Sequence, residues 1–349
     1  MTLKVGIVGC GFISNEHIAD WRGVQAQIVA VCDKNISLAE SQAKKHGIPK
    51  FYGNVHPMIK SEKVDVVSIC TPAHIRSEVI VPFMENGTHV VVEKPFALTV
   101  AEASKIIDQQ RRHGVKLTVV HSWLFSYAMD KALQLLRNKG IGNIIGAQIN
   151  ALSTPYNIMT SDPLHWAHTI KGGRFAEMIS HPIYLLQKVL GELEVDNVLC
   201  AKLGHYNWMP VDELSVMLKG SKGSMGSIYC SFNSPRHEAI LKVFGTEAIM
   251  EIDLFKQILI VKRKIGVERR HILTDEMKFL GSYIKSAFSV NFAVLLGRYK
   301  GMHKMLIKAV ADSLEKDTPL PVTPDEALSV TRTYEDLSSK IDACIKACA

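Results

Sequence analysis

Closely spaced cysteines are missing from this sequence. Its seven cysteines are scattered without a Cys-x-x-Cys pair, and Cys344 and Cys348 lie at i and i+4 of a predicted helix with no histidine cluster beside them. Structural zinc sites and disulfide frameworks require grouped cysteines at characteristic spacings. We therefore expect seven reduced cysteines, no disulfide and no metal site.

Long hydrophobic runs are also missing. The most apolar stretch, Phe279–Gly297, is interrupted by serine, lysine and asparagine, and it is too short and too broken to cross a bilayer. No signal peptide precedes the first predicted strand. We expect a cytoplasmic protein without a membrane partner.

A strong excess of one charge is absent as well. The net charge is +7 for 349 residues, and the densest basic patch, Lys262–Lys264 with Arg269–His271, flanks a predicted turn at Gly266. This pattern favours a solvated hairpin, and the alternative is a surface that attracts an anionic substrate. Because no aromatic residues interleave these charges, nucleic acid is not an expected partner.

Predicted strands and helices alternate in the first third of the chain, which has the length and composition of a globular protein with room for two domains. The strands are 4–8, 27–32, 64–69, 90–92 and 116–120; the helices are a segment ending at 21, then 75–85 and 99–113. This alternation predicts a parallel sheet with right-handed crossovers. Ligands of such sheets bind at the carboxyl ends of the strands.

A glycine motif follows the first predicted strand. In Gly9-Cys10-Gly11-Phe12-Ile13-Ser14, Gly9 allows a tight turn, Gly11 lets a pyrophosphate approach the backbone, and Ser14 is a small replacement for the usual third glycine. Asp33 ends the second strand, where an acidic side chain holds ribose hydroxyls and disfavours a 2′-phosphate. The pattern predicts NAD, with NADP less favoured; Asp33 as a simple turn residue is the alternative.

The stretch from residue 89 to residue 96 carries the strongest chemical signal. Three valines predict a strand buried on both faces, and Glu93, Lys94 and Pro95 follow it directly. A lysine at the carboxyl edge of a sheet can give or take a substrate proton. The alternative is a salt-bridged turn.

On these motifs the sequence resembles the Gfo/Idh/MocA family of oxidoreductases over nearly its whole length. The matching segments are Gly9–Ser14 with His17, Cys70–Pro72, Glu93–Ala97, Gly172–Gly173 with Glu177 and His181, and Pro321–Pro324. The resemblance implies an N-terminal Rossmann domain and a C-terminal α/β domain. The large, open and mostly antiparallel sheet of the second domain would form a homodimer or homotetramer.

The resemblance also implies the site residues. Lys94, His181 and Glu177 would be catalytic, and the Lys94–Pro95 peptide would be cis. The implied cofactor-binding residues are Gly9, Gly11, Phe12, Ile13, Asp33, Thr71, Pro72, His74, Glu93, Lys94, Pro95, Ser122 and Trp166.

Several positions depart from the family pattern. Ala73 and Arg76 replace an asparagine and a histidine after the Thr-Pro pair, and Ser122 and Leu124 replace an asparagine and an arginine. Two aspartates become Glu177 and Tyr184. These changes leave the cofactor prediction intact, but they fall where the family recognises its substrate.

The second half of the chain reads as an antiparallel sheet followed by helices. The predicted strands are 143–151, 194–203, 214–219, 225–231, 239–244, 248–252 and 257–261. A helix ending at Leu190 would place Glu177 and His181 at i and i+4 on one face, although Pro182 either kinks it or starts a new helix. His165 and His168 beside Trp166 have a structural role or line a sugar site.

Three segments are expected: a Rossmann domain over 1–122, a substrate-binding and oligomerisation domain over 123–322, and a C-terminal helix over 323–349 that packs back on the Rossmann domain. The tail reads as a helix over 303–314, an extended linker over 316–324 and a helix over 325–341 with Asp325 as its N-cap.

The sequence therefore predicts an NAD(H)-dependent oxidoreductase. It would move a hydride between nicotinamide and a secondary alcohol or ketone of a sugar, cyclitol or nucleotide-sugar, with Lys94 or His181 taking the proton and the other holding the oxygen. The alternatives are a redox-neutral sugar lyase or hydrolase with transient oxidation, and a non-catalytic NAD-binding regulator.

Overall fold

The computed structural model describes residues 2–221, 223–263 and 301–348, with a few single positions between 277 and 296. Contacts divide the chain into two compact units. The first contains Met1–Ser122 and Gly301–Arg332, and the second contains Trp123–Lys300 and Thr333–Ala349.

Two features of the sequence fall outside the described residues. They are the turn around Gly266 with the basic residues Lys264 and Arg269–His271, and most of the apolar stretch 279–297. Within the described part of the chain, no helix is both long enough and apolar enough to span a membrane.

The first unit contains the predicted parallel sheet. Its six strands run in the order β3-β2-β1-β4-β5-β6. They are β1 (Lys4–Val8), β2 (Gln27–Cys32), β3 (Lys50–Tyr52), β4 (Val66–Ile69), β5 (His89–Val92) and β6 (Leu117–Val119). All five pairings are parallel, and β1 lies between β2 and β4, where the strand order reverses. The Rossmann-type fold is confirmed.

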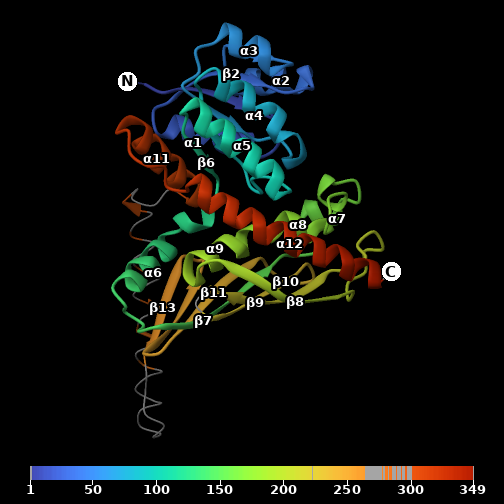
Figure 1. Cartoon of the computed structure of the whole chain (residues 1–349), viewed down its shortest axis with the longest axis vertical. Helices are drawn as coiled ribbons and strands as arrows, with labels where there is room; N and C mark the ends of the chain where they lie inside the picture. The colour runs from blue at the N-terminus through green and yellow to red at the C-terminus, as the bar shows by residue number, and fades with distance from the viewer. Residues whose placement is uncertain are drawn as a thin grey trace, which may run out of the picture. The chain divides into compact units, whose positions relative to one another are not determined.

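Helices connect these strands, and a further helix near the end of the chain also belongs to this unit. They are α1 (Ser14–Gly23), α2 (Ile36–His46), α3 (Val55–Ser61), the 3₁₀ turn η1 (Ala73–Ile75), α4 (Arg76–Glu85), α5 (Val100–His113) and α11 (Met302–Glu315). The α11 helix packs on α1 (Figure 1), so Gly301–Arg332 belongs to the first unit.

The second unit is built on a seven-stranded sheet with the order β13-β12-β11-β7-β10-β9-β8. Its strands are β7 (Ile144–Leu152), β8 (Leu193–Ala201), β9 (Glu213–Gly220), β10 (Met225–Ser231), β11 (Glu238–Gly245), β12 (Ala248–Asp253) and β13 (Ile258–Arg263). The pairings are antiparallel except that β7 and β10 are parallel. The mostly antiparallel sheet is therefore confirmed.

Helices cover one face of this sheet. They are α6 (Tyr127–Arg137), α7 (Ile158–Ser161), α8 (Gly173–Met178) and α9 (Ser180–Leu190), with 3₁₀ turns η2 (Ser122–Phe125) and η3 (Trp166–His168). Figure 1 shows α6 and α9 along the sheet, and contacts join α9 to β7 and β10, and α6 to β12 and β13. Of the alternatives at Pro182, a new helix holds: it begins at Ser180, because proline has no N–H to continue the hydrogen-bond ladder.

The final helix, α12 (Pro324–Cys348), corrects one prediction. Its N-cap is Thr323, not Asp325, because the Thr323 hydroxyl accepts the Glu326 N–H and the Glu326 carboxylate accepts the Thr323 N–H. Asp325 lies in the first turn instead. The first turns of α12 belong to the first unit, where Ala327 joins the hydrophobic core, and residues from Thr333 onward belong to the second unit.

Candidate functional site

The glycine turn after β1 leaves one stretch of backbone uncovered. Gly9 has φ +92°, and a Cβ there would lie 2.8 Å from the backbone carbon of Cys70, so no other residue fits. A Cβ on Gly11, in contrast, would meet nothing within 4 Å. Phe12 beside it is 88% exposed. Packing within the protein thus explains Gly9, whereas the bare backbone at Gly11 is open to a ligand.

The Asp33 carboxylate is held at the end of β2. It accepts the N–H of Cys10 at 2.8 Å and the N–H of Asn35 at 2.8 Å, and the side chain is half-buried. Asn35 in turn caps α2. Both hydrogen bonds fix the carboxylate beside the glycine turn, so Asp33 has a structural contact in addition to its predicted ligand role.

Arg76 joins the loops that follow β4 and β5. Arg76 is 3% exposed, and its guanidinium donates to the carbonyl of Thr71 from Nε at 3.0 Å and from Nη2 at 2.9 Å. It also donates to the carbonyls of Glu93, Lys94 and Pro95. A buried cation with several carbonyl acceptors fixes both loops in one arrangement. Arg76, which departs from the family pattern, thus supports the loops that carry Thr71 and Lys94.

The Glu93 carboxylate turns into the protein. It accepts from Nε2 of His17 at 3.0 Å and from the Lys94 N–H at 3.1 Å. Burial alone would raise the pKa of Glu93, but hydrogen bonds with His17 and His303 hold it well below its usual range. Lys94 itself is half-buried, and the Lys94–Pro95 peptide is cis as the resemblance implied.

Two histidines surround this carboxylate. His303 on α11 lies 2.7 Å from Asp20, 3.2 Å from Nε2 of His17 and 3.6 Å from Glu93. Burial opposes its charge, but hydrogen bonds with Asp20 and Glu93 raise the pKa of His303 to about 9. Burial and the nearby His303 lower the pKa of His17. The ligand atoms of His17, Glu93 and His303 lie within 4.8 Å of one another, because the Nε2 atoms of both rings lie close to the Glu93 carboxylate.

His181 of the second unit is fixed on two sides. Its Nδ1 lies 2.7 Å from the Tyr184 hydroxyl oxygen. That oxygen accepts a hydrogen bond from the backbone N–H of Trp123 at 3.1 Å. Its ring stacks on Trp123 with centroids 4.2 Å apart and planes 12° from parallel. Tyr184 is 2% exposed. The imidazole therefore has a defined plane and a defined partner at Nδ1.

Glu177 is paired within a buried part of the second unit. Its carboxylate accepts from Nη1 of Arg174 at 2.5 Å, and both side chains are less than a tenth exposed. The guanidinium of Arg174 also lies over the Phe232 ring, 4.8 Å from its centroid. Glu177 thus forms its ion pair with Arg174 in the interior of the second unit.

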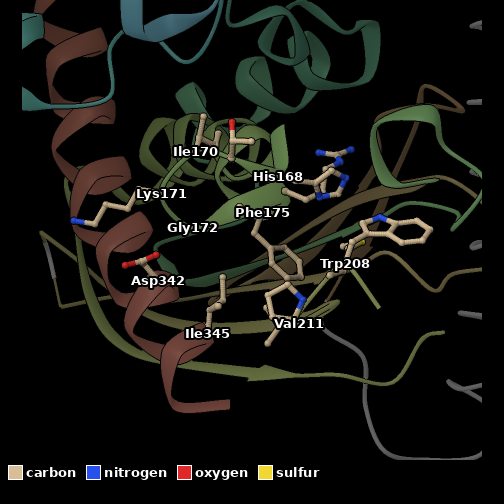
Figure 2. A pocket seen from close by; sticks show the side chains of 14 residues that line it. His168, Ile170, Lys171, Gly172, Phe175, Trp208, Val211, Asp342 and Ile345 are labelled. Atoms are coloured by element: carbon tan, nitrogen blue, oxygen red, sulfur yellow. The ribbon is translucent and has the colours of Figure 1, made fainter. Parts of the chain in front are cut away.

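Arg174 also lines a cavity of about 420 Å³ in the second unit. Figure 2 shows His168 and Trp208 on one side of it, Lys171 and Asp342 on the other, and Phe175 between them. This volume is within the range of small-ligand sites. His168 therefore lines a cavity, whereas Trp166 is 39% exposed in η3.

The structure brings the predicted residues of the first unit to one sheet edge. Because all six strands are parallel, the segments after β1, β2, β4, β5 and β6 share that edge. They carry Gly9, Gly11, Phe12, Ile13, Asp33, Thr71, Pro72, His74, Glu93, Lys94, Pro95 and Ser122. Trp166, Glu177 and His181 belong to the second unit.

Sequence reasoning missed the roles of Arg76, His303 and Tyr184. Arg76 and Tyr184 were noticed only as departures from the family pattern, and His303 carried no local signal because its partners are far away in the sequence.

Comparisons with known proteins agree with this geometry. Residues 3–121 match a family model described as an oxidoreductase family with an NAD-binding Rossmann fold, and residues 129–251 match the GFO/IDH/MocA C-terminal domain. D-apiose dehydrogenase from Paraburkholderia graminis is 29% identical over 161 residues, which are 46% of this chain and 43% of that protein.

Two further proteins are similar over nearly their whole length. Myo-inositol 2-dehydrogenase from Thermotoga maritima is 23% identical over 336 residues, which cover 93% of this chain and 92% of that protein. The WlbA dehydrogenase of Bordetella pertussis, solved with NADH and UDP-GlcNAcA, has a TM-score of 0.78 at 20% identity and covers 97% of this chain and 96% of its own. Since both parts of the chain match one family, it belongs to the Gfo/Idh/MocA family of NAD-dependent oxidoreductases.

Proposed function

We propose that this protein transfers a hydride between NAD and a secondary alcohol or ketone of a sugar, cyclitol or nucleotide-sugar. The observation that carries the proposal is the single sheet edge that holds the open Gly11 backbone, Asp33 and Lys94. The similar proteins named above act on apiose and inositol, or were solved with a nucleotide-sugar. A polyhydroxylated substrate is the class that these proteins share.

The residues of the first unit fit NAD. An uncovered backbone at Gly11, beside the start of α1, suits a pyrophosphate at a helix N-terminus. The Asp33 carboxylate at the end of β2 suits the ribose hydroxyls and opposes a 2′-phosphate. When bound, NAD supplies the hydride acceptor or donor at its nicotinamide ring.

The residues of this chain would supply proton transfer and positioning. Lys94, placed after a buried strand and supported by Arg76, carries an amine that can move a proton. His181, whose ring is held by Tyr184 and Trp123, is the second group that could hold the oxygen or move a proton. Glu177 and Arg174 form a buried ion pair, which fixes the positions of both charges in the second unit.

A substrate screen tests this proposal. Purified protein would be mixed with NAD and a panel of inositols, pentoses, hexoses and uridine-diphosphate sugars, and NADH would be followed by absorbance. We expect stoichiometric NADH from at least one compound. Product formation without NADH release would favour the redox-neutral lyase, and NAD binding without turnover of any compound would favour the regulator.

A further inference from the structure

Three buried side chains of the first unit bring three ligand atoms close together. Nε2 of His17 lies 3.0 Å from Oε1 of Glu93, and Nε2 of His303 lies 3.2 Å from Nε2 of His17. The third separation, from Nε2 of His303 to Oε1 of Glu93, is 3.6 Å. His17, Glu93 and His303 are each less than a tenth exposed. These three atoms are called the buried triangle below.

Hydrogen bonds alone leave one contact of the buried triangle unfavourable. An ionised carboxylate only accepts hydrogen bonds, and an imidazole nitrogen either donates one or accepts one. If both Nε2 atoms carry a hydrogen, both rings can donate to Glu93, but two donor nitrogens then lie 3.2 Å apart. If only one carries a hydrogen, the bare nitrogen faces the carboxylate oxygen, which is also an acceptor. No placement of hydrogens on the two rings makes all three contacts favourable.

A bound cation removes this conflict, because all three atoms can then give a lone pair to the same ion. Zinc binds histidine nitrogen and carboxylate oxygen at about 2.0–2.2 Å in tetrahedral geometry, which places two ligand atoms about 3.3 Å apart. The separations of 3.0, 3.2 and 3.6 Å lie around this value. Zinc sites with two histidines, one glutamate and a fourth position for another ligand occur in proteins.

The second nitrogen of each histidine has a partner of its own. Nδ1 of His303 lies 2.7 Å from Oδ2 of Asp20, and Nδ1 of His17 lies 3.1 Å from Oγ of Ser68. A histidine that binds a metal almost always donates its other N–H to a carboxylate or another oxygen, which orients the ring. Both rings are therefore held with Nε2 as the atom that faces the buried triangle.

From this geometry we propose that the buried triangle binds one Zn²⁺ ion, with Nε2 of His17, Nε2 of His303 and Oε1 of Glu93 as ligands. The ion would have a structural role, since all three side chains are buried. It would join α1, the segment after β5 and α11, which carry the three ligands. The sequence prediction of no metal site depended on cysteine spacing, and this set of ligands contains no cysteine.

A metal ion and a proton exclude one another at Nε2 of His303. A nitrogen that binds a metal carries no hydrogen, so zinc binding would release the proton of His303. The raised pKa of His303, about 9, therefore describes the protein without metal. Measurements of stability against pH would be made on protein treated with a chelator.

A zinc titration of the full chain tests the proposal without substrate or cofactor. Protein stripped of metal with a chelator, and then freed of the chelator, would be titrated with Zn²⁺ in competition with a chromophoric chelator. We expect one Zn²⁺ per chain with a Kd of about 10⁻⁶ M or tighter, as for structural zinc. Binding weaker than this, or no binding, would overturn the proposal.

Three variants locate the bound ion. His303→Gln removes a ligand and should weaken zinc binding by at least about a hundredfold, and Asp20→Asn should weaken it by about tenfold to a hundredfold. His89→Gln is the matched control, because His89 is a half-buried histidine of the same unit whose Nδ1 accepts the Lys116 N–H. It should bind zinc as the wild type does. Equal affinity in His303→Gln and the wild type would show that zinc binds elsewhere and would overturn the proposal.

Cobalt in place of zinc reports the geometry of the site. Four-coordinate Co²⁺ absorbs visible light strongly, whereas six-coordinate Co²⁺ absorbs it weakly. We expect strong absorption in the wild type and its loss in His303→Gln; a weak spectrum in the wild type would overturn the proposed ligands. Circular dichroism would verify folding. If His303→Gln does not fold, Glu93→Gln, which keeps the size of the side chain, replaces it, and an unchanged zinc affinity in that variant would equally overturn the proposal.

Discussion

The buried guanidinium of Arg76 donates a hydrogen bond to the backbone carbonyl of Glu93. The same side chain binds the carbonyl of Thr71, so one residue joins the loops after β4 and β5. The position of Lys94 at the sheet edge thus depends on a residue that lies outside both loops.

Replacing Arg76 by lysine should therefore loosen both loops. Lysine keeps the charge but cannot form the planar set of bonds, which leaves buried carbonyls without donors. We expect the free energy of unfolding to fall by about 2 kcal/mol and the affinity for NAD to decrease. Urea denaturation and fluorescence titration with NAD would measure these changes.

Arg22→Lys is the matched control, since Arg22 is exposed and donates to the His46 carbonyl away from both loops. Its effect on stability should be within about 0.5 kcal/mol. Equal effects of the two substitutions on NAD affinity would contradict the role given to Arg76.

The charge of His303 predicts how stability depends on pH. Its pKa is about 9 in the folded protein against an ordinary 6.5, so its contribution is fully present below pH 6.5 and is lost as the pH rises through about 9. The groups that face it are Asp20, Glu93, Glu16 and His17. The total loss should be about 3 kcal/mol at most.

Denaturant titrations between pH 6.5 and 9.5 would measure this loss. In His303→Gln the slope over that interval should be much smaller, because the variant has no proton to release at this position. The thiols of Cys10 and Cys32, whose pKa values burial raises to about 12, contribute equally to both proteins. A wild-type curve as flat as that of the variant would show that His303 is not charged.

Asp33 should select NAD over NADP, because a 2′-phosphate would lie against its carboxylate. We expect NAD(H) to bind at least several-fold more tightly, and Asp33→Ser to narrow the difference. Fluorescence titration with both cofactors measures it. Asp65→Ser is a matched control: Asp65 also accepts a backbone N–H, from Lys4 at 2.8 Å, but it precedes β4 at the opposite edge of the sheet. If Asp33→Ser preferred NAD over NADP as strongly as the wild type does, Asp33 would not be the residue that selects the cofactor.

The sheet face that the described helices of the second unit leave uncovered predicts self-association. In the part of the chain that the structure describes, Met217, Met225 and Tyr229 on neighbouring strands are about 40–60% exposed, and Ile249 is 39% exposed. Apolar side chains gathered on one sheet face favour burial against a second copy. We expect a dimer or tetramer, and Met225→Glu should reduce its mass in light scattering.

A surface substitution elsewhere provides the comparison. Leu38 is 40% exposed on α2 of the first unit, so Leu38→Asp should leave the mass unchanged. A monomeric wild type at micromolar concentration would contradict the prediction.

Most strands and several of the helices could be predicted because their signals are local. Valine runs and alternating residues identified the buried strands of both sheets, and Pro182 indicated the helix boundary near His181. The strand β3 was missed because it has only three residues, mostly exposed, and so no measurable alternation. The parallel pairing of β7 with β10 was also beyond local patterns, since it joins strands from different parts of the chain.

Only the site residues that lie within sequence motifs could be predicted. The Glu-Lys-Pro segment and the glycine turn predicted which residues gather at one edge. They did not indicate which distant side chains hold them there. The partners of Glu93 come from α1 and α11, and a buried histidine such as His303 has no periodicity that distinguishes it from a surface residue.

Lys94 is the residue whose replacement bears most directly on the proposed function. It follows the buried β5 strand, its backbone carbonyl is held by Arg76 at 3.3 Å, and its amide is bonded to Glu93. In Lys94→Ala these backbone contacts remain, and so does the uncovered Gly11 that would meet the pyrophosphate. The Kd of NAD should therefore change little.

Turnover should fall much further than cofactor affinity. Removing a general acid–base group typically costs roughly a hundredfold to ten-thousandfold in rate, and stopped-flow measurement of hydride transfer would show this in kcat. Lys94→Arg should recover little activity, since an arginine keeps the charge but cannot release its proton near neutral pH. If Lys94 were only a turn residue, Lys94→Ala would instead lower the melting temperature and leave the turnover of the folded protein near that of the wild type. That result would transfer the proton step to His181.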